Sequence, residues 1–129
     1  MTHSVLVVDD EPMARTLLRL MLVRAGFEVL EAADGLEALT KVKEQLPDIM
    51  ILDVMMPGID GFAVCEALRK EEETSELPVI MLSAKTDTLS VRRGLRAGAT
   101  KYLTKPVSQE DLTRNVLDTL KSIESYKNP

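Results

Sequence analysis

The sequence predicts an α/β fold in which helices cover both faces of a doubly wound parallel sheet. Three observations support this class: short aliphatic runs alternate with segments of helical periodicity, the connections are a few residues long, and Gly or Pro marks several boundaries. Strands that alternate with helices over such connections require parallel crossovers. The length of 129 residues corresponds to about one domain, so we expect residues 1–129 to form a single domain.

The first strand and the first helix are the clearest pair of elements. Residues 4–8, Ser-Val-Leu-Val-Val, form an apolar run of the kind found in strands that are covered on both faces. Gly26 is typical of the residue that ends a helix. Between these segments apolar residues recur at helical spacing, at Ala14, Leu17, Leu18, Met21, Leu22 and Ala25.

The same alternation continues to the end of the chain. Pro47 and Pro78 stand just before two apolar runs, where a preceding helix must already have ended. Gly98 follows a segment of helical periodicity and is expected to end it. We predict further strands over residues 28–31, 48–52, 79–82 and 101–103, and further helices over 35–45, 61–72, 89–97 and 109–125.

Composition and charge exclude several classes of protein. Apolar residues make up 45% of the chain and charged residues 29%, as in globular domains. No apolar run is long enough to span a bilayer, so we expect a cytoplasmic protein without membrane contact. The net charge of −5 disfavours direct binding to nucleic acid. His3 is the single histidine, which excludes histidine-based metal cages and hydrolytic triads in the core, and Cys65 is expected to be a buried structural thiol.

Polar side chains follow four of the predicted strands. Asp9 and Asp10 come after the first strand, Asp53 after the third, Ser83 after the fourth, and Lys105 shortly after the fifth. In a doubly wound sheet ligands bind at the carboxyl ends of the strands, so these side chains should meet at one edge. Three carboxylates brought together would repel one another unless a cation or protons relieved the repulsion. A hard divalent ion such as Mg²⁺ is the natural partner of such an oxygen-rich site.

These residues could also carry phosphoryl chemistry. An ionised aspartate beside a cation can attack phosphorus and form an acyl phosphate, while a lysine and a hydroxyl hold the phosphoryl oxygens. Each residue alone has an ordinary structural explanation. Asp9 or Asp10 could cap the following helix. Asp53, Ser83 and the pair Lys105–Pro106 could be turn residues.

The motifs that contain these residues occur in a fixed order and at a familiar spacing. Together they resemble the receiver domain of bacterial response regulators, in particular single-domain regulators of the chemotaxis type, over residues 4–124. This resemblance implies a flavodoxin-like fold with five parallel strands in the order 2-1-3-4-5. The motifs are Asp9-Asp10-Glu11, the segment Asp53-Val-Met-Met-Pro-Gly-Ile-Asp-Gly61, Leu82-Ser83-Ala84, and Gly98-Ala99 leading through Tyr102 to Lys105-Pro106.

The resemblance implies a role for each residue of a Mg²⁺ site. Asp53 would be the phosphoacceptor and a metal ligand. Asp10 would bind Mg²⁺ directly, and Asp9 would bind it through a water molecule. The backbone carbonyl of Met55 would be a further ligand.

The resemblance also implies a phosphoryl-binding group and a switch. Lys105 would pair with the phosphoryl oxygens, and Ser83 would donate a hydrogen bond to one of them. Tyr102 corresponds to an aromatic residue that turns inward when Ser83 is drawn toward the phosphoryl group. The peptide bond before Pro106 would be cis.

The function implied is a signalling switch in two-component signalling. A sensor histidine kinase, or a histidine phosphotransfer protein, would phosphorylate Asp53, and an output protein would bind the altered face. Beyond its own phosphotransfer and dephosphorylation, the chain would not be an enzyme. Arg92 and Arg96 share one helical face, which could bind an acidic partner or could simply be solvated.

Three alternatives were open from the sequence. The chain could be the receiver piece of a longer DNA-binding transcriptional regulator, although its short tail favours a complete chain. It could be a Mg²⁺-dependent phosphohydrolase with an aspartyl nucleophile, but that mechanism predicts an acid at position 55, where Met55 stands, and the chain leaves no room for a cap. A flavin-binding electron carrier is disfavoured because aromatic residues make up 3% of the chain and the segment after the first strand is not a Ser/Thr/Gly-rich phosphate loop.

Overall fold

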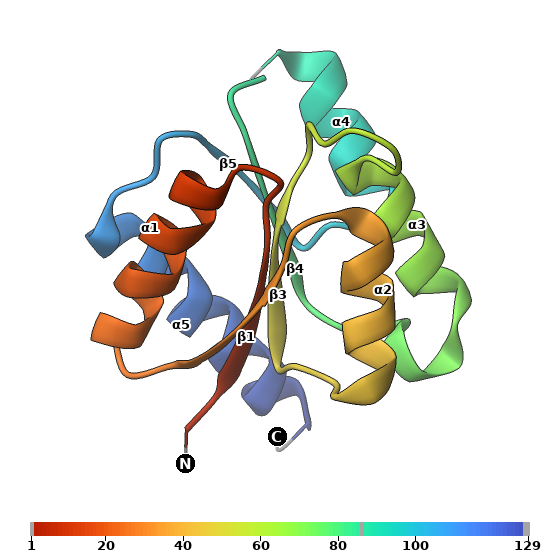
Figure 1. Cartoon of the computed structure of the whole chain (residues 1–129). Coiled ribbons are helices and arrows are strands. Elements are labelled where there is room, and N and C mark those ends of the chain that lie inside the picture. Colours follow the sequence, from red (N-terminus) through yellow and green to blue (C-terminus); the bar gives the residue numbers. More distant parts are fainter. Residues whose placement is uncertain (1, 86, 128–129) are drawn as a thin grey trace.

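The computed structural model describes residues 2–85 and 87–127, in which strands and helices alternate (Figure 1). The five strands are parallel and lie in the order β2-β1-β3-β4-β5, so the predicted fold class and strand order are confirmed. The elements are β1 (Ser4–Val8), α1 (Pro12–Arg24), β2 (Glu28–Ala32), α2 (Gly35–Glu44), β3 (Ile49–Asp53), α3 (Gly61–Lys70), the 3-10 helix η1 (Glu72–Thr74), β4 (Val79–Ser83), α4 (Thr88–Arg96), β5 (Lys101–Thr104) and α5 (Gln109–Lys127).

Alternate residues of each central strand pack on opposite faces of the sheet. Val5 and Val7 of β1 belong to a core shared with α1 and α5. Leu6 and Val8 belong to a second core, shared with α2 and α3. Figure 1 shows the same layers, with α1 and α5 on one side of the sheet and α2, α3 and α4 on the other. Burial on both faces explains why β1, β3 and β4 are nearly continuous apolar runs.

Side-chain caps fix the starts of three helices. Asp34, Asp60 and Asp87 each accept a hydrogen bond from a backbone N–H three residues ahead, at the beginning of α2, α3 and α4. The carboxylate then satisfies one of the N–H groups that a helix leaves unpaired at its start. Asp9 does not play this part for α1, because its carboxylate accepts from the N–H of Glu11, before the helix begins.

The third helix is shorter than the sequence predicts. We expected it to reach residue 72, but α3 ends at Lys70 and Glu71 takes an extended conformation. The buried Thr74 explains the difference, because its hydroxyl donates to the carbonyl of Leu68 at 2.5 Å. That side-chain bond competes with a further helical turn. The chain continues instead into η1.

The carboxyl ends of the strands carry the predicted site residues. β3 and β4 each extend one residue further than predicted. Asp53 and Ser83 are therefore the last residues of these strands and not the first residues of the loops that follow. Gly61 lets α3 begin directly against this edge, since a Cβ atom there would lie 2.6 Å from the carbonyl oxygen of Asp53. None of the helices in residues 2–85 and 87–127 has both the length and the hydropathy of a membrane span.

Candidate functional site

Three carboxylates meet at the carboxyl edge of the sheet. Asp9 follows β1, Asp10 is next to it, and Asp53 ends β3; one carboxylate oxygen of each lies within 4.8 Å of the other two. Asp9 is 1% exposed and Asp53 is 7% exposed, whereas Asp10 is open to solvent. Two of the acids are therefore buried, and the third is an exposed neighbour of both.

Lys105 supplies a positive charge to this cluster from the loop after β5. Its Nζ atom donates to Oδ2 of Asp9 at 2.8 Å and lies 3.4 Å from Oδ1 of Asp53. Burial alone would lower the pKa of Lys105, but the hydrogen bond to Asp9 and the charges of both aspartates outweigh it and raise the pKa. Lys105 is therefore an ammonium ion, and it links the loop after β5 to the ends of β1 and β3.

The carboxyl group of Asp53 is harder to ionise than an ordinary aspartate. The pKa of Asp53 is raised from 3.8 to about 6, chiefly because the group is buried. The charge of Lys105 lowers this pKa, the charge of Asp9 raises it, and a backbone hydrogen bond from Met55 lowers it. One ammonium ion faces three carboxylates, so the cluster keeps an excess of negative charge. A divalent cation with oxygen ligands would relieve both the repulsion and the cost of burial.

The donor set fits Mg²⁺. Carboxylate oxygens are the ligands that Mg²⁺ prefers, and the exposed Asp10 leaves room for the waters that the ion usually keeps. The side chain of Met55 is 55% exposed. The expectation that its carbonyl is a ligand stays a prediction.

Ser83 and Tyr102 meet at the backbone of Lys85 rather than at the carboxylates. The buried Oγ of Ser83 accepts a hydrogen bond from the N–H of Lys85 at 3.0 Å. The hydroxyl of Tyr102 donates to the carbonyl of Lys85 at 2.7 Å. The ring of Tyr102 lies on α4, because a Cβ atom at Gly94 would be 2.7 Å from its Cδ2 atom. These contacts connect the edge of the sheet with α4 through three residues.

The end of β5 is fixed by β4 and by a cis peptide bond. The N–H of Lys105 donates to the carbonyl of Ser83 at 2.9 Å, which continues the pairing of the two strands past Thr104. The Lys105–Pro106 peptide bond is cis, as the resemblance implies. Together these features place the lysine side chain over the ends of β1 and β3.

Arg15, which the sequence does not mark as a site residue, touches the site from α1. Its Nη1 atom donates to the backbone carbonyl of Asp9 at 2.8 Å. The only signal in the sequence is a basic residue one turn into the helix that follows the paired acids. Basic residues are common on helices, so this signal could not have identified the contact.

Comparison with known proteins identifies the family. Residues 5–117 match the family model of the response regulator receiver domain. The uncharacterized transcriptional regulatory protein YrkP of Bacillus subtilis is 42% identical over 127 residues, which cover 98% of this chain and 53% of that protein. The chain thus spans about half the length of the curated relatives it matches.

Solved structures agree with the family model. The chemotaxis protein CheY4 of Vibrio cholerae has a TM-score of 0.88 at 36% identity, covering 92% of this chain and 98% of that one. The receiver domain of the sensor histidine kinase PA1611 from Pseudomonas aeruginosa has a TM-score of 0.87 at 28% identity, covering 94% and 99%, and holds a magnesium ion in its active-site cleft. Fold, motifs and relatives agree over nearly the whole chain, which belongs to the response regulator receiver domain family of two-component signalling.

Proposed function

We propose that residues 1–129 act as one receiver domain, a switch that accepts a phosphoryl group on Asp53 with Mg²⁺ bound beside it. The observation that carries the proposal is the convergence of Asp9, Asp10 and Asp53, with the ammonium group of Lys105 in contact with Asp9 and Asp53. The magnesium ion in the cleft of the Pseudomonas receiver domain supports the choice of metal. Three separate strand ends supply these groups, so chance juxtaposition is a poor explanation.

Asp53 supplies the nucleophile of the proposed transfer. Above a pH of about 6 its carboxylate is ionised even before a cation binds. One carboxylate oxygen attacks phosphorus as the bond from phosphorus to the leaving group breaks, which leaves an acyl phosphate on Asp53. With a phosphohistidine donor the leaving group is the imidazole nitrogen. Mg²⁺ held by the three carboxylates would supply positive charge where charge develops on the phosphoryl oxygens.

Lys105 and Ser83 are proposed to hold the transferred group. The Nζ atom of Lys105 already lies 3.4 Å from Oδ1 of Asp53, so it can reach an oxygen bonded to phosphorus with little movement. The Oγ of Ser83 accepts from Lys85, which leaves its own hydrogen free for donation to a phosphoryl oxygen. Movement of Ser83 would shift Lys85 and hence the hydroxyl of Tyr102. This is the route by which phosphorylation would reach α4.

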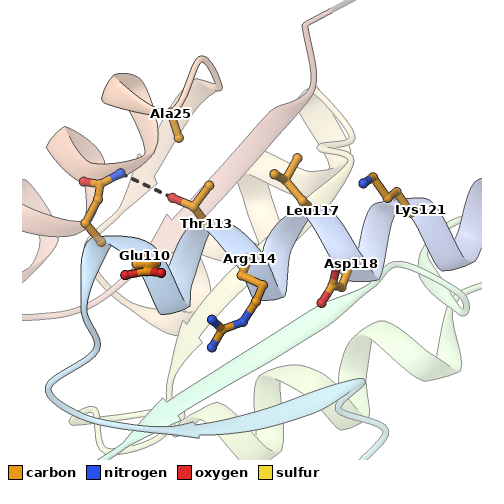
Figure 2. A pocket seen from close by; sticks show the side chains of 8 residues that line it. Ala25, Glu110, Thr113, Arg114, Leu117, Asp118 and Lys121 are labelled. Atoms are coloured by element: carbon orange, nitrogen blue, oxygen red, sulfur yellow. Dashed lines mark hydrogen bonds between the residues drawn. The ribbon is translucent and has the colours of Figure 1, made fainter.

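An exposed apolar stripe on α1 is the proposed docking site for a helix of the histidine-bearing donor. Met13, Leu17, Leu20 and Val23 are 80%, 54%, 53% and 52% exposed, and the stripe starts three residues after Asp10 in the sequence. Figure 2 shows a pocket between Ala25, which follows α1, and α5, where Thr113 and Leu117 point to the side on which Ala25 lies. Solvent-exposed apolar residues at helical spacing are typical of a surface that packs against another helix.

The output side of the switch is proposed to lie on α4. Arg92 and Arg96 are exposed there and share a face with Leu89, which is 77% exposed, while Arg93 lies 4.3 Å above the ring of Phe62. An acidic output protein fits this charge. Our expectation that the chain makes no direct contact with nucleic acid gains no support from the relatives, since several are named transcriptional regulators. It rests on the net charge of −5 alone.

The test of the proposal is the intact mass after incubation with acetyl phosphate. We expect a gain of about 80 Da that requires Mg²⁺, survives acid and is lost in base, as an acyl phosphate should be. The variant Asp53→Asn should show no gain, and Asp118→Asn, which removes an exposed acid from α5, should react like the wild type. A wild-type protein that binds Mg²⁺ and stays unmodified would refute the assignment of Asp53.

A further inference from the structure

Arg15 joins the loop of the acidic cluster to the edge of the sheet. Its Nη1 atom donates to the carbonyl of Asp9 at 2.8 Å, and its Nε atom donates to Oε1 of Glu31 at 3.2 Å. Glu31 lies on β2, the edge strand beside β1. The guanidinium group thus binds a backbone carbonyl of the site, and the carboxylate that neutralises it lies outside the cluster.

Two further residues, Arg19 and Lys41, also contact Glu31 and hold it in place. The Nε atom of Arg19, one turn further along α1, lies 3.3 Å from Oε2 of Glu31. From α2, the ammonium group of Lys41 donates to the backbone carbonyl of Glu31. Side chains of Arg15, Arg19 and Glu31 are 20%, 39% and 34% exposed, so solvent only partly weakens these contacts. Glu31 is therefore a fixed anchor for Arg15.

The loop from Asp9 to Glu11 has particular need of such a contact. Glu11 is the N-cap residue of α1, and among the described residues its side chain makes no capping bond; α2, α3 and α4 each begin with a capping aspartate. All four polar groups of Asp9 are used: its N–H by Ala32, its carbonyl by Arg15, and its two carboxylate oxygens by Glu11 and Lys105.

One of these contacts, the hydrogen bond from Lys105, is open to competition from a cation. A divalent ion that recruits the carboxylate of Asp9, directly or through water, competes with Lys105 for it. The backbone contacts of Asp9 remain, and the one from Arg15 is charge-assisted and comes from the helix that follows the loop. The hydrogen bond from Arg15 therefore fixes the position of Asp9 and of the adjacent Asp10 relative to the end of β1.

We propose that Arg15 is a positioning residue for the divalent-cation site and that Glu31 holds it in that role. This inference rests on the proposed function, since it concerns the Mg²⁺ site. Glu31 also keeps the guanidinium group from turning toward the cluster, where it would compete with the cation for the carboxylates. Arg15 acts through the Asp9 carbonyl and does not touch the reacting atoms.

The direction in which Mg²⁺ affinity changes when Arg15 is replaced distinguishes a positioning role from a purely electrostatic one. Arg15 is a cation close to a cation site, so its charge alone opposes Mg²⁺, and its removal would tighten binding. A positioning role predicts the reverse. Loss of a group that orients metal ligands typically weakens metal affinity by about 10-fold or more.

The experiment is a calorimetric titration with Mg²⁺ of the wild type, Arg15→Gln, Glu31→Gln and the double variant. We expect both single variants to bind about 10-fold more weakly and the double variant little worse than Arg15→Gln, because both act on one contact. Arg19→Gln is the matched control: it removes a cation that shares Glu31 but does not reach Asp9. Glu31 keeps its contacts with Arg15 and Lys41 in this variant, so the Mg²⁺ affinity should stay near that of the wild type. Thermal unfolding without Mg²⁺ verifies that each variant is folded.

Three results would overturn the inference. If folded Arg15→Gln binds Mg²⁺ as tightly as the wild type or more tightly, Arg15 has no positioning role. The same follows if Arg19→Gln loses as much Mg²⁺ affinity as Arg15→Gln. If Arg15→Gln does not fold, wild-type affinity in Glu31→Gln overturns it. Failure of the wild type to bind Mg²⁺ is a different outcome, because it refutes the proposed function and takes this inference with it.

Discussion

Replacing Asp53 by Asn should stabilise the metal-free protein at neutral pH. Burial raises the pKa of Asp53 from 3.8 to about 6 in the folded chain. Below pH 3.8 the group is protonated in both states and has no effect. As the pH rises to about 6, the unfolded chain loses this proton and the folded chain keeps it, so the stability that depends on this group falls. Above that pH the penalty is constant.

The size of the effect follows from the two pKa values. A tenfold change in proton affinity corresponds to about 1.4 kcal/mol, so a rise from 3.8 to about 6 corresponds to about 3 kcal/mol at neutral pH. The neutral amide of Asn has the shape of the protonated carboxyl group and removes this penalty. In a domain of this size the gain raises the unfolding midpoint by about 10 °C.

Urea unfolding followed by circular dichroism, with a chelator present, measures this difference. Wild type, Asp53→Asn and the surface control Asp118→Asn are compared near about pH 4 and about pH 7.5, on either side of the transition. The free energy of unfolding should increase only at the higher pH and only in Asp53→Asn. Saturating Mg²⁺ should stabilise the wild type and narrow the gap. An Asp53→Asn variant no more stable than the wild type at the higher pH would refute the account of a buried carboxylate that Lys105 compensates only in part.

Three further predictions concern the lysine, the docking stripe and the switch. Lys105→Met should destabilise the metal-free protein by about 3 kcal/mol at neutral pH because two buried carboxylates lose their cation; unchanged stability in urea contradicts this. Leu17→Glu should slow phosphotransfer from a phosphohistidine-bearing kinase about 10-fold or more and leave transfer from acetyl phosphate unchanged. Leu36→Glu, at a site 66% exposed on α2, should affect neither of these reactions. Gly94→Ala should displace the ring of Tyr102 and cost about 1–3 kcal/mol; an unshifted Tyr102 ring resonance in an NMR spectrum would contradict the packing.

Most of the fold was predictable from local sequence patterns. Aliphatic runs such as residues 4–8 identify strands that are buried on both faces, and Gly26 marks the end of α1. The end of α3 could not be predicted, because it depends on a bond from Thr74 to a carbonyl six residues earlier. A threonine in a charged segment gives no sign in the sequence that it will be buried.

The candidate site was predictable as a set of residues but not as a network. Parallel topology explains why strand ends meet, so Asp9, Asp53 and Lys105 could be expected at one edge. The sequence does not show that the lysine prefers Asp9, at 2.8 Å, over Asp53, at 3.4 Å. Nor does it show the contact of Arg15 with the Asp9 carbonyl, which depends on how α1 packs on the sheet.

The most direct test of the central claim locates the phosphoryl group in the chain. The protein is phosphorylated with acetyl phosphate and Mg²⁺, reduced with borohydride, which converts a phosphoaspartate to homoserine, and mapped by tandem mass spectrometry. The account predicts homoserine at position 53, dependent on Mg²⁺, and at no other aspartate of the described chain. Homoserine at Asp10 or Asp9, or modification that proceeds equally well without Mg²⁺, would contradict it.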